Sequence, residues 1–127
     1  MITAARTANL ASAIRAGHFE IISGVSPKQG GGDEGPTPHE LIESALAACT
    51  IITVQMYANR KEWPLEGVDV TVQITKEEES GSVFQRDISF RGALSDEQRA
   101  RLFEIANKCP IHRLLVRKID VVSNLKS

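Results

Sequence analysis

The sequence lacks the charge pattern that marks nucleic-acid-binding and membrane-surface proteins. Its 15 basic and 16 acidic residues nearly cancel, which leaves a formal net charge of −1. Binding to nucleic acid or to an anionic membrane needs clustered positive charge, and no basic stripe is present. Aromatic residues, at 5% of the chain, do not interleave with basic ones either. We therefore expect neither nucleic acid nor membrane among its partners.

Segments that would direct the chain out of the cytoplasm are also missing. The first residues, Met1 to Thr7, do not have the charged-then-apolar layout of a signal peptide. The longest uncharged run, Ser44 to Asn59, is about 16 residues, short of the roughly 18–20 that span a bilayer. We expect a cytoplasmic protein, in which a cysteine pair is more often catalytic or redox-active than a permanent disulfide.

Several catalytic and binding motifs are absent as well. The two cysteines, Cys49 and Cys109, do not form a Cys-x-x-Cys motif, which argues against a thioredoxin-type site. No Gly-x-Ser-x-Gly sequence indicates a serine hydrolase. The glycines at 30–32 precede a predicted helix, where a phosphate could bind. Residues 30–35 do match Gly-x-Gly-x-x-Gly, but no strong predicted strand leads directly into them and Gly-Lys-Ser/Thr does not occur, so a nucleotide site is disfavoured.

What the sequence does contain is a well-marked helix near its centre. Thr37 and Pro38 are typical of an N-cap and a first helical position, and Glu40 can complete a capping box with Thr37. The helix is predicted to run from Pro38 to about Arg60. It is apolar on nearly every side in its middle, so we expect a central, buried helix. In so small a chain, such a helix suggests help from a partner subunit.

The other predicted elements do not alternate as they would in a parallel sheet, which favours an α+β fold in one domain, residues 1–127. A glycine-rich loop at 24–36 precedes the long helix, and a polar turn at 77–82 joins two strands into a hairpin. Ser95 caps a second helix, with Gln98 in the capping-box position. The predicted strands are 3–14, 18–23, 68–74, 83–92 and 118–123, and the predicted helices are 38–60, 96–108 and 110–115.

The two cysteines have different predicted settings. Cys109 precedes Pro110 and is placed at a helix N-cap, where free N–H groups favour a thiolate. Cys49 lies in mid-helix and would need a cation from elsewhere in the fold; Arg6, Arg15 and Arg113 are candidates. Two other interpretations stay open. Both cysteines could be inert core residues, or Cys109 and His112 could bind a metal with Cys49 and His39.

Two stretches form a specific pair of motifs. One runs from Gly35-Pro36-Thr37-Pro38-His39-Glu40-Leu41 to Ala47-Ala48-Cys49-Thr50, and the other is Lys108-Cys109-Pro110-Ile111-His112-Arg113. Together with the hairpin and the helix start at Leu94–Gln98, they resemble the OsmC/Ohr family of osmotically inducible and organic-hydroperoxide-resistance proteins. The likeness covers nearly the whole chain. It is closer to the smaller OsmC-like branch than to the best-characterised hydroperoxidases.

The resemblance implies an OsmC-like α+β fold in an intertwined homodimer, with an antiparallel sheet packed on the long cysteine-bearing helices. It also implies a reaction. A thiolate at Cys49 attacks the hydroperoxide O–O bond, and the resulting sulfenic acid condenses with Cys109 to a disulfide. An external dithiol of the lipoyl type then reduces the disulfide. By position, Cys49 matches the peroxidatic cysteine and Cys109 the resolving one. No cofactor and no metal are implied.

One position departs from the family pattern. Its hydroperoxidases have a glutamate directly after the proline of the helix start, paired with an N-terminal arginine that activates the thiolate. Here that position is His39, and Arg6 is the best candidate for the arginine. Our leading hypothesis is a thiol-dependent peroxidase that reduces organic hydroperoxides. The alternative, motivated by His39, is a non-enzymatic OsmC-like dimer that binds a small apolar or thiol ligand.

Overall fold

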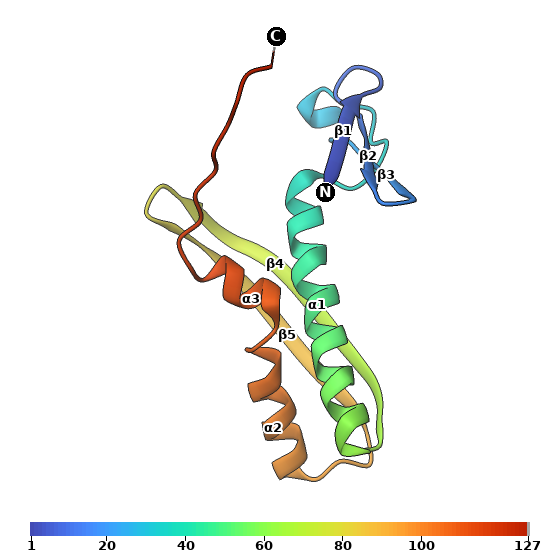
Figure 1. Cartoon of the computed structure of the whole chain (residues 1–127), viewed down its shortest axis with the longest axis vertical. Coiled ribbons are helices and arrows are strands. Elements are labelled where there is room, and N and C mark those ends of the chain that lie inside the picture. The colour runs from blue at the N-terminus through green and yellow to red at the C-terminus, as the bar shows by residue number, and fades with distance from the viewer. Residues whose placement is uncertain (127) are drawn as a thin grey trace. The chain divides into compact units, whose positions relative to one another are not determined.

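The computed structural model describes residues 1–126 and is an α+β protein in which antiparallel strands accompany one long helix (Figure 1). It forms two compact units, one from Met1 to Glu43 and one from Ser44 onward. In chain order the elements are β1 (Ile2–Arg6), β2 (Ser12–Ala16), β3 (Phe19–Ser23), the 3-10 helix η1 (Pro27–Gln29), α1 (Pro38–Lys61), β4 (Leu65–Glu78), β5 (Gly81–Gly92), α2 (Asp96–Ala106) and α3 (Pro110–Leu115). The expected single sheet is in fact two, β1-β2-β3 and β4-β5.

The first unit contains the three-stranded antiparallel sheet. The sequence predicts one strand over 3–14, and this prediction is wrong because the chain reverses between β1 and β2. There the Thr7 N–H donates to the Ala11 carbonyl at 3.0 Å. Between them Asn9 has a φ of 48°, a left-handed conformation that asparagine tolerates. The next turn, at Gly17 with a φ of 65°, lies where the sequence predicts it.

The glycine-rich loop packs closely on the end of β3. Gly35 passes so near the Ile22 carbonyl that a Cβ atom would not fit, and Gly31 approaches the Val25 carbonyl in the same way. The Ser23 hydroxyl donates to the Pro36 carbonyl at 2.7 Å, which fixes the end of the loop. Two of the glycines therefore have a structural role within this unit.

Helix α1 begins as the sequence predicts. The Glu40 N–H donates to Thr37 Oγ1 at 3.1 Å, and the Thr37 N–H donates to Glu40 Oε1 at 3.0 Å. These two bonds close the predicted capping box and satisfy two N–H groups that the helix itself leaves without acceptors. The helix ends at Lys61, one residue beyond its predicted end.

Helix α1 is buried along one stripe rather than on nearly every side, so that prediction is wrong for the single chain. Much of the rest of its middle is apolar and exposed, including Ile51, Ile52 and Met56. By length and composition alone, α1 could cross a membrane, a test that the core helix of a soluble protein also passes. The buried stripe consists of Leu46, Thr50, Val54 and Ala58, spaced four residues apart.

Strands β4 and β5 form the predicted hairpin; β4 is longer at both ends than the sequence suggests, and β5 begins earlier, at Gly81, and ends at Gly92 as predicted. Exposed and half-buried residues alternate along β5, as they do in a strand with one covered face. The half-buried series is Phe84, Arg86, Ile88 and Phe90. Ile88 and Phe90 pack against the core, whereas Arg86 is the one charged residue of the series.

Helix α2 completes the core of the second unit. Its predicted cap is confirmed: the Gln98 N–H donates to Ser95 Oγ at 3.1 Å, and the Ser95 N–H donates to Gln98 Oε1 at 2.9 Å. Leu102 and Ala106 of α2 are fully buried against Val54 and Ala58 of α1. α1 and α2 therefore lie side by side along the hairpin (Figure 1).

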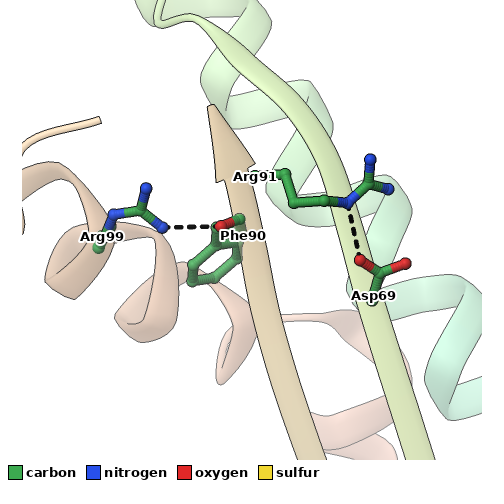
Figure 2. A network of polar contacts seen from close by, with 4 residues as sticks. All are labelled: Asp69, Phe90, Arg91 and Arg99. Carbon is green, nitrogen blue, oxygen red and sulfur yellow. Dashed lines mark hydrogen bonds and ion pairs between the residues drawn. The ribbon is translucent and has the colours of Figure 1, made fainter. Parts of the chain in front are cut away.

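Arginines attach the hairpin to α2 and link its two strands (Figure 2). Arg99 of α2 donates to the Phe90 carbonyl at 2.7 Å and to the Gly92 carbonyl at 2.9 Å. On the exposed side, Arg91 of β5 pairs with Asp69 of β4 at 2.9 Å. The first contact fixes the start of α2 on the strand end, whereas the exposed ion pair contributes little to stability.

Residues after α3 do not form the strand predicted at 118–123. In the part of the chain that the structure describes, this segment pairs with no other strand. The apolar residues that motivated the prediction, Ile119, Val121 and Val122, are exposed. A strand is stable only when its backbone groups find a partner, so the apolar pattern alone does not produce one.

Candidate active site

The structure brings Cys49 and Cys109 together in the second unit. Cys49 is half-buried in the middle of α1, Cys109 is fully buried, and both are free thiols. Cys49 is near enough to Cys109 to raise the pKa of the Cys109 thiol. The Thr53 hydroxyl, one turn further along α1, lies 3.9 Å from the Cys49 sulfur. Two residues far apart in sequence therefore form one thiol pair.

Cys109 is the N-cap of α3, as the sequence predicts. Its backbone is extended, with φ −62° and ψ 139°, and Pro110 takes the first helical position. The Cys109 sulfur accepts a hydrogen bond from the His112 N–H at 3.3 Å. A sulfur atom thus takes the capping role that a serine or aspartate oxygen usually has.

The expected effect of the N-cap on the Cys109 thiol is present, but burial outweighs it. Burial raises the pKa of the Cys109 thiol above its ordinary value of 9.0, because the charged thiolate loses its hydration when it is buried. The His112 N–H lowers that pKa, but its effect is smaller than that of burial. The neighbouring Cys49 raises it further, and the Thr50 hydroxyl lowers it slightly. Cys109 is therefore a neutral thiol near pH 7.

Arg86, which sequence reasoning missed, is the cation of this site. Its Nη1 atom donates to Thr50 Oγ1 at 3.0 Å and makes a longer contact, 3.5 Å, with the Ala106 carbonyl. Its Nη2 atom donates to Asn107 Oδ1 at 2.9 Å and lies 3.1 Å from His112 Nδ1. Arg86 thus connects the helix of Cys49 with residues on both sides of Cys109.

His112 is neutral, with its proton on Nε2. An arginine side chain can only donate, so Nδ1 must be the acceptor in its contact with Arg86. Burial lowers the pKa of His112 below its ordinary value of 6.5, and the nearby charge of Arg86 lowers it further. The imidazole therefore presents a donor, Nε2–H, on the side away from Arg86.

Thr50 links the arginine to α1. Its hydroxyl donates to the Leu46 carbonyl at 2.7 Å and accepts from Arg86. It is fully buried and directly follows Cys49 in the chain. Thr50 therefore connects helix α1 to strand β5 through its bond to Arg86.

The remaining predicted cations and His39 are on other elements than Arg86. Arg6 ends β1, Arg15 is on β2 and His39 is in the first turn of α1, so all three belong to the first unit, and all are exposed. Arg113 is exposed on α3, beside Lys118 and Ile119. The roles of Arg6 and His39 at the thiol stay predictions from the family resemblance.

The strand pattern contains the signal that would have identified Arg86. Phe84, Ile88 and Phe90 define the covered face of β5. Alternate residues of a strand share a face, so Arg86 belongs to the same face. A charged side chain on a covered face destabilises the fold unless it is hydrogen-bonded. Arg86 at this position therefore indicates a polar cluster beneath the strand.

A cavity of about 630 Å³ adjoins the Arg86 cluster. Ser82, Gln85, Arg86, Asn107 and His112 supply polar groups to its wall, and the other half of the lining is apolar. The apolar lining comes from Leu46, Phe84, Phe103, Leu115 and Val116. A concave, mostly apolar space with a few convergent polar groups is the usual form of a small-molecule site. Residues 1–126 contain no cluster of three or more histidine, cysteine, aspartate or glutamate side chains that could hold a metal.

Comparisons with known proteins agree with this architecture. The profile of the OsmC family, described as OsmC-like protein, matches residues 30–124. No curated protein sequence matches the chain significantly. Among solved structures, the chain is similar to an OsmC-like protein from Mycoplasma pneumoniae, with a TM-score of 0.75 and 20% identity over 91% of this chain and 85% of that one.

Other similar structures carry names that refer to hydroperoxides. One is the organic hydroperoxide resistance protein OsmC from Legionella pneumophila, with a TM-score of 0.67 and 21% identity over 91% of this chain and 88% of that one. Another, from Vibrio cholerae, is assigned to organic hydroperoxide resistance and holds captopril in one of its active sites. Its TM-score is 0.66, with 25% identity over 94% of this chain and 87% of that one. The profile match covers most of the sequence, and the chain belongs to the OsmC-like protein family.

Proposed function

We propose that the protein is a thiol-dependent peroxidase that reduces organic hydroperoxides through Cys49 and Cys109. The observation that carries this proposal is the contact between two free thiols that differ in burial. Cys49 is half-buried and can meet a substrate, whereas Cys109 is fully buried and protonated. That difference suits a nucleophile and a resolving partner.

The reaction has three steps. The Cys49 thiolate attacks the O–O bond of the hydroperoxide, which leaves Cys49 as a sulfenic acid and releases an alcohol. The Cys109 thiol then attacks the Cys49 sulfur, so that an S–S bond forms and hydroxide leaves with the thiol proton as water. A dithiol of the lipoyl type reduces the disulfide by exchange. In this proposal His39 and Arg6 act near Cys49, as their positions in the family motif imply.

The test is one stoichiometric addition of cumene hydroperoxide to the reduced protein, followed by peptide mass spectrometry without reductant. We expect an intrachain Cys49–Cys109 disulfide and dithiol-dependent turnover that is lost in Cys49→Ser. The Cys109→Ser variant is the matched control, because it should consume one equivalent of peroxide and stop at the sulfenic acid. Thiols that stay reduced for hours in the wild-type protein would rule the peroxidase out.

The cavity favours a second candidate, a non-enzymatic protein that binds a small apolar or thiol compound. The captopril in the Vibrio cholerae relative is such a thiol. Captopril binding measured by calorimetry, in a protein whose thiols do not respond to peroxide, would favour this candidate over the enzyme. Binding lost in Phe103→Ala would place the compound in the cavity beside Arg86.

We also propose that the protein is a cytoplasmic homodimer. The exposed apolar face of α1 needs a cover, and a second copy of the helix can supply one. Light scattering should give twice the chain mass of 13.9 kDa. Recovery of the protein in the membrane fraction of lysed cells would contradict both the location and the mode of assembly.

A further inference from the structure

Arg86 bonds to residues that neighbour each of the two cysteines in the chain. Its guanidinium reaches Thr50, which adjoins Cys49, at 3.0 Å. It also reaches Asn107, two residues before Cys109, at 2.9 Å, and His112, three residues after, at 3.1 Å. A single side chain from β5 therefore ties the segment that carries Cys109 to the helix that carries Cys49.

Cys109 itself is fully buried, but few polar bonds fix the segment around it. Cys109 lies between the end of α2 and the start of α3, a helix of six residues with no buried side chain. So short a helix is not stable by itself. The cap bond from the His112 N–H to the Cys109 sulfur is local and fixes no position relative to α1. Apart from the interactions of the Cys109 sulfur with Cys49 and Thr50, the long-range polar bonds described for this segment come from Arg86, to Asn107 and His112.

The hydrogen bonds of Arg86 act as orienting contacts. No ion pair is formed by Arg86 in the part of the chain that the structure describes, and its partners there are neutral groups.

We propose that Arg86 is a positioning residue for disulfide closure, which holds the Cys109 sulfur against Cys49 and leaves contact with the peroxide to other groups. The step that it assists is the attack of the Cys109 thiol on the Cys49 sulfenic acid. The S–O bond breaks, the S–S bond forms, and the hydroxide leaves with the thiol proton as water. In this form the inference rests on the proposed function, but disulfide closure itself can be measured without peroxide.

The first experiment therefore equilibrates the full-length protein with glutathione buffers and measures the fraction of Cys49–Cys109 disulfide. Arg86→Met, which keeps the side-chain length and removes the donors, should lower the equilibrium constant for closure at least tenfold. For a two-electron couple this is a shift of about 30 mV toward easier reduction. The control is Arg91→Met on the same strand, which removes only an exposed ion pair with Asp69 and should match the wild type.

The second experiment follows closure in time after one equivalent of cumene hydroperoxide. In Arg86→Met, dimedone should trap Cys49 sulfenic acid for at least tenfold longer than in the wild type. Arg86→Lys should fall between the two, because an ammonium keeps the charge but does not reach all the partners. A variant with merely reduced stability would show a lower Tm with an unchanged glutathione equilibrium at temperatures where it is folded.

The outcomes separate the two proposals. If the wild type forms the disulfide with glutathione but not with peroxide, the peroxidase proposal fails and the glutathione result still decides the role of Arg86. If Arg86→Met closes the disulfide with the wild-type equilibrium constant and rate, the positioning role is overturned. Should Arg86→Met not fold, Arg86→Lys decides the question, and a wild-type equilibrium there overturns the role as well.

Discussion

The Nδ1 atom of His112 accepts a hydrogen bond from the guanidinium of Arg86 at a distance of 3.1 Å. This contact exists only while His112 is neutral. Because Arg86 is always protonated, a proton on Nδ1 would replace the hydrogen bond with the repulsion of two cations. The polar cluster beside the thiols is therefore sensitive to pH at one ring nitrogen.

The stability of the fold should decrease in mild acid because of His112. Its pKa in the folded protein is lower than the ordinary value of 6.5, so between these two values the unfolded chain binds more protons. The contribution of His112 to the free energy of unfolding should thus be constant above about pH 6.5. It should fall as the pH drops toward the pKa of His112 in the folded protein. Urea unfolding from pH 5 to 8 measures this, and His112→Asn should flatten the slope.

The matched control for that experiment is His18→Asn. His18 is exposed in the first unit, at the turn between β2 and β3. Its replacement should leave the pH dependence as it is in the wild type. An equal slope in the wild type and in His112→Asn would show that other groups set the acid response.

The two thiols should react at different rates with an alkylating reagent. Cys109 is fully buried and has a raised pKa, whereas Cys49 is half-buried. Brief treatment of the reduced protein with iodoacetamide at pH 8 should therefore label Cys49 at least tenfold faster than Cys109, as read by peptide mass spectrometry. In 8 M urea the difference should disappear. Faster labelling of Cys109 in the folded protein would contradict the burial described for it.

The capping box of α2 should contribute measurably to stability. In Ser95→Ala, the Gln98 N–H loses its acceptor at the helix start, which should lower the free energy of unfolding by about 1 kcal/mol. Ser80→Ala, in the exposed turn of the hairpin, is the control and should change it by less than about 0.5 kcal/mol. Denaturant unfolding followed by circular dichroism gives both values.

The exposed face of α1 provides a test of the proposed dimer. Ile52 is 58% exposed in the single chain, so Ile52→Lys should leave the fold intact but place a charge in the proposed interface. Light scattering should then report a monomer, while Asn59→Lys at an exposed position near the helix end should leave the dimer in place. A dimer that persists in Ile52→Lys would exclude this face as the contact.

Local signals in the sequence predicted much of the fold. Thr37 with Glu40 and Ser95 with Gln98 are capping pairs whose partners lie three residues apart, so no tertiary information is needed to read them. Pro110 likewise identifies Cys109 as an N-cap. In each case the residues that interact are neighbours in the chain.

The parts that the sequence did not predict depend on distant contacts. Arg86 meets Thr50 across 36 positions and His112 across 26, so no local pattern announces the cluster. The pKa of Cys109 follows from burial, which outweighs the local cap. Reversal of the chain at Asn9 depends on one left-handed residue inside an otherwise strand-like sequence.

The cap of α3 ties the thiol chemistry to the shape of the neighbouring cavity. The sulfur that would close a disulfide is also the acceptor that starts this six-residue helix. The same helix and its C-cap place His112, Leu115 and Val116 in the cavity wall. A disulfide at Cys109 would therefore act at one end of this helix, whose other end borders the cavity, and should alter the cavity wall.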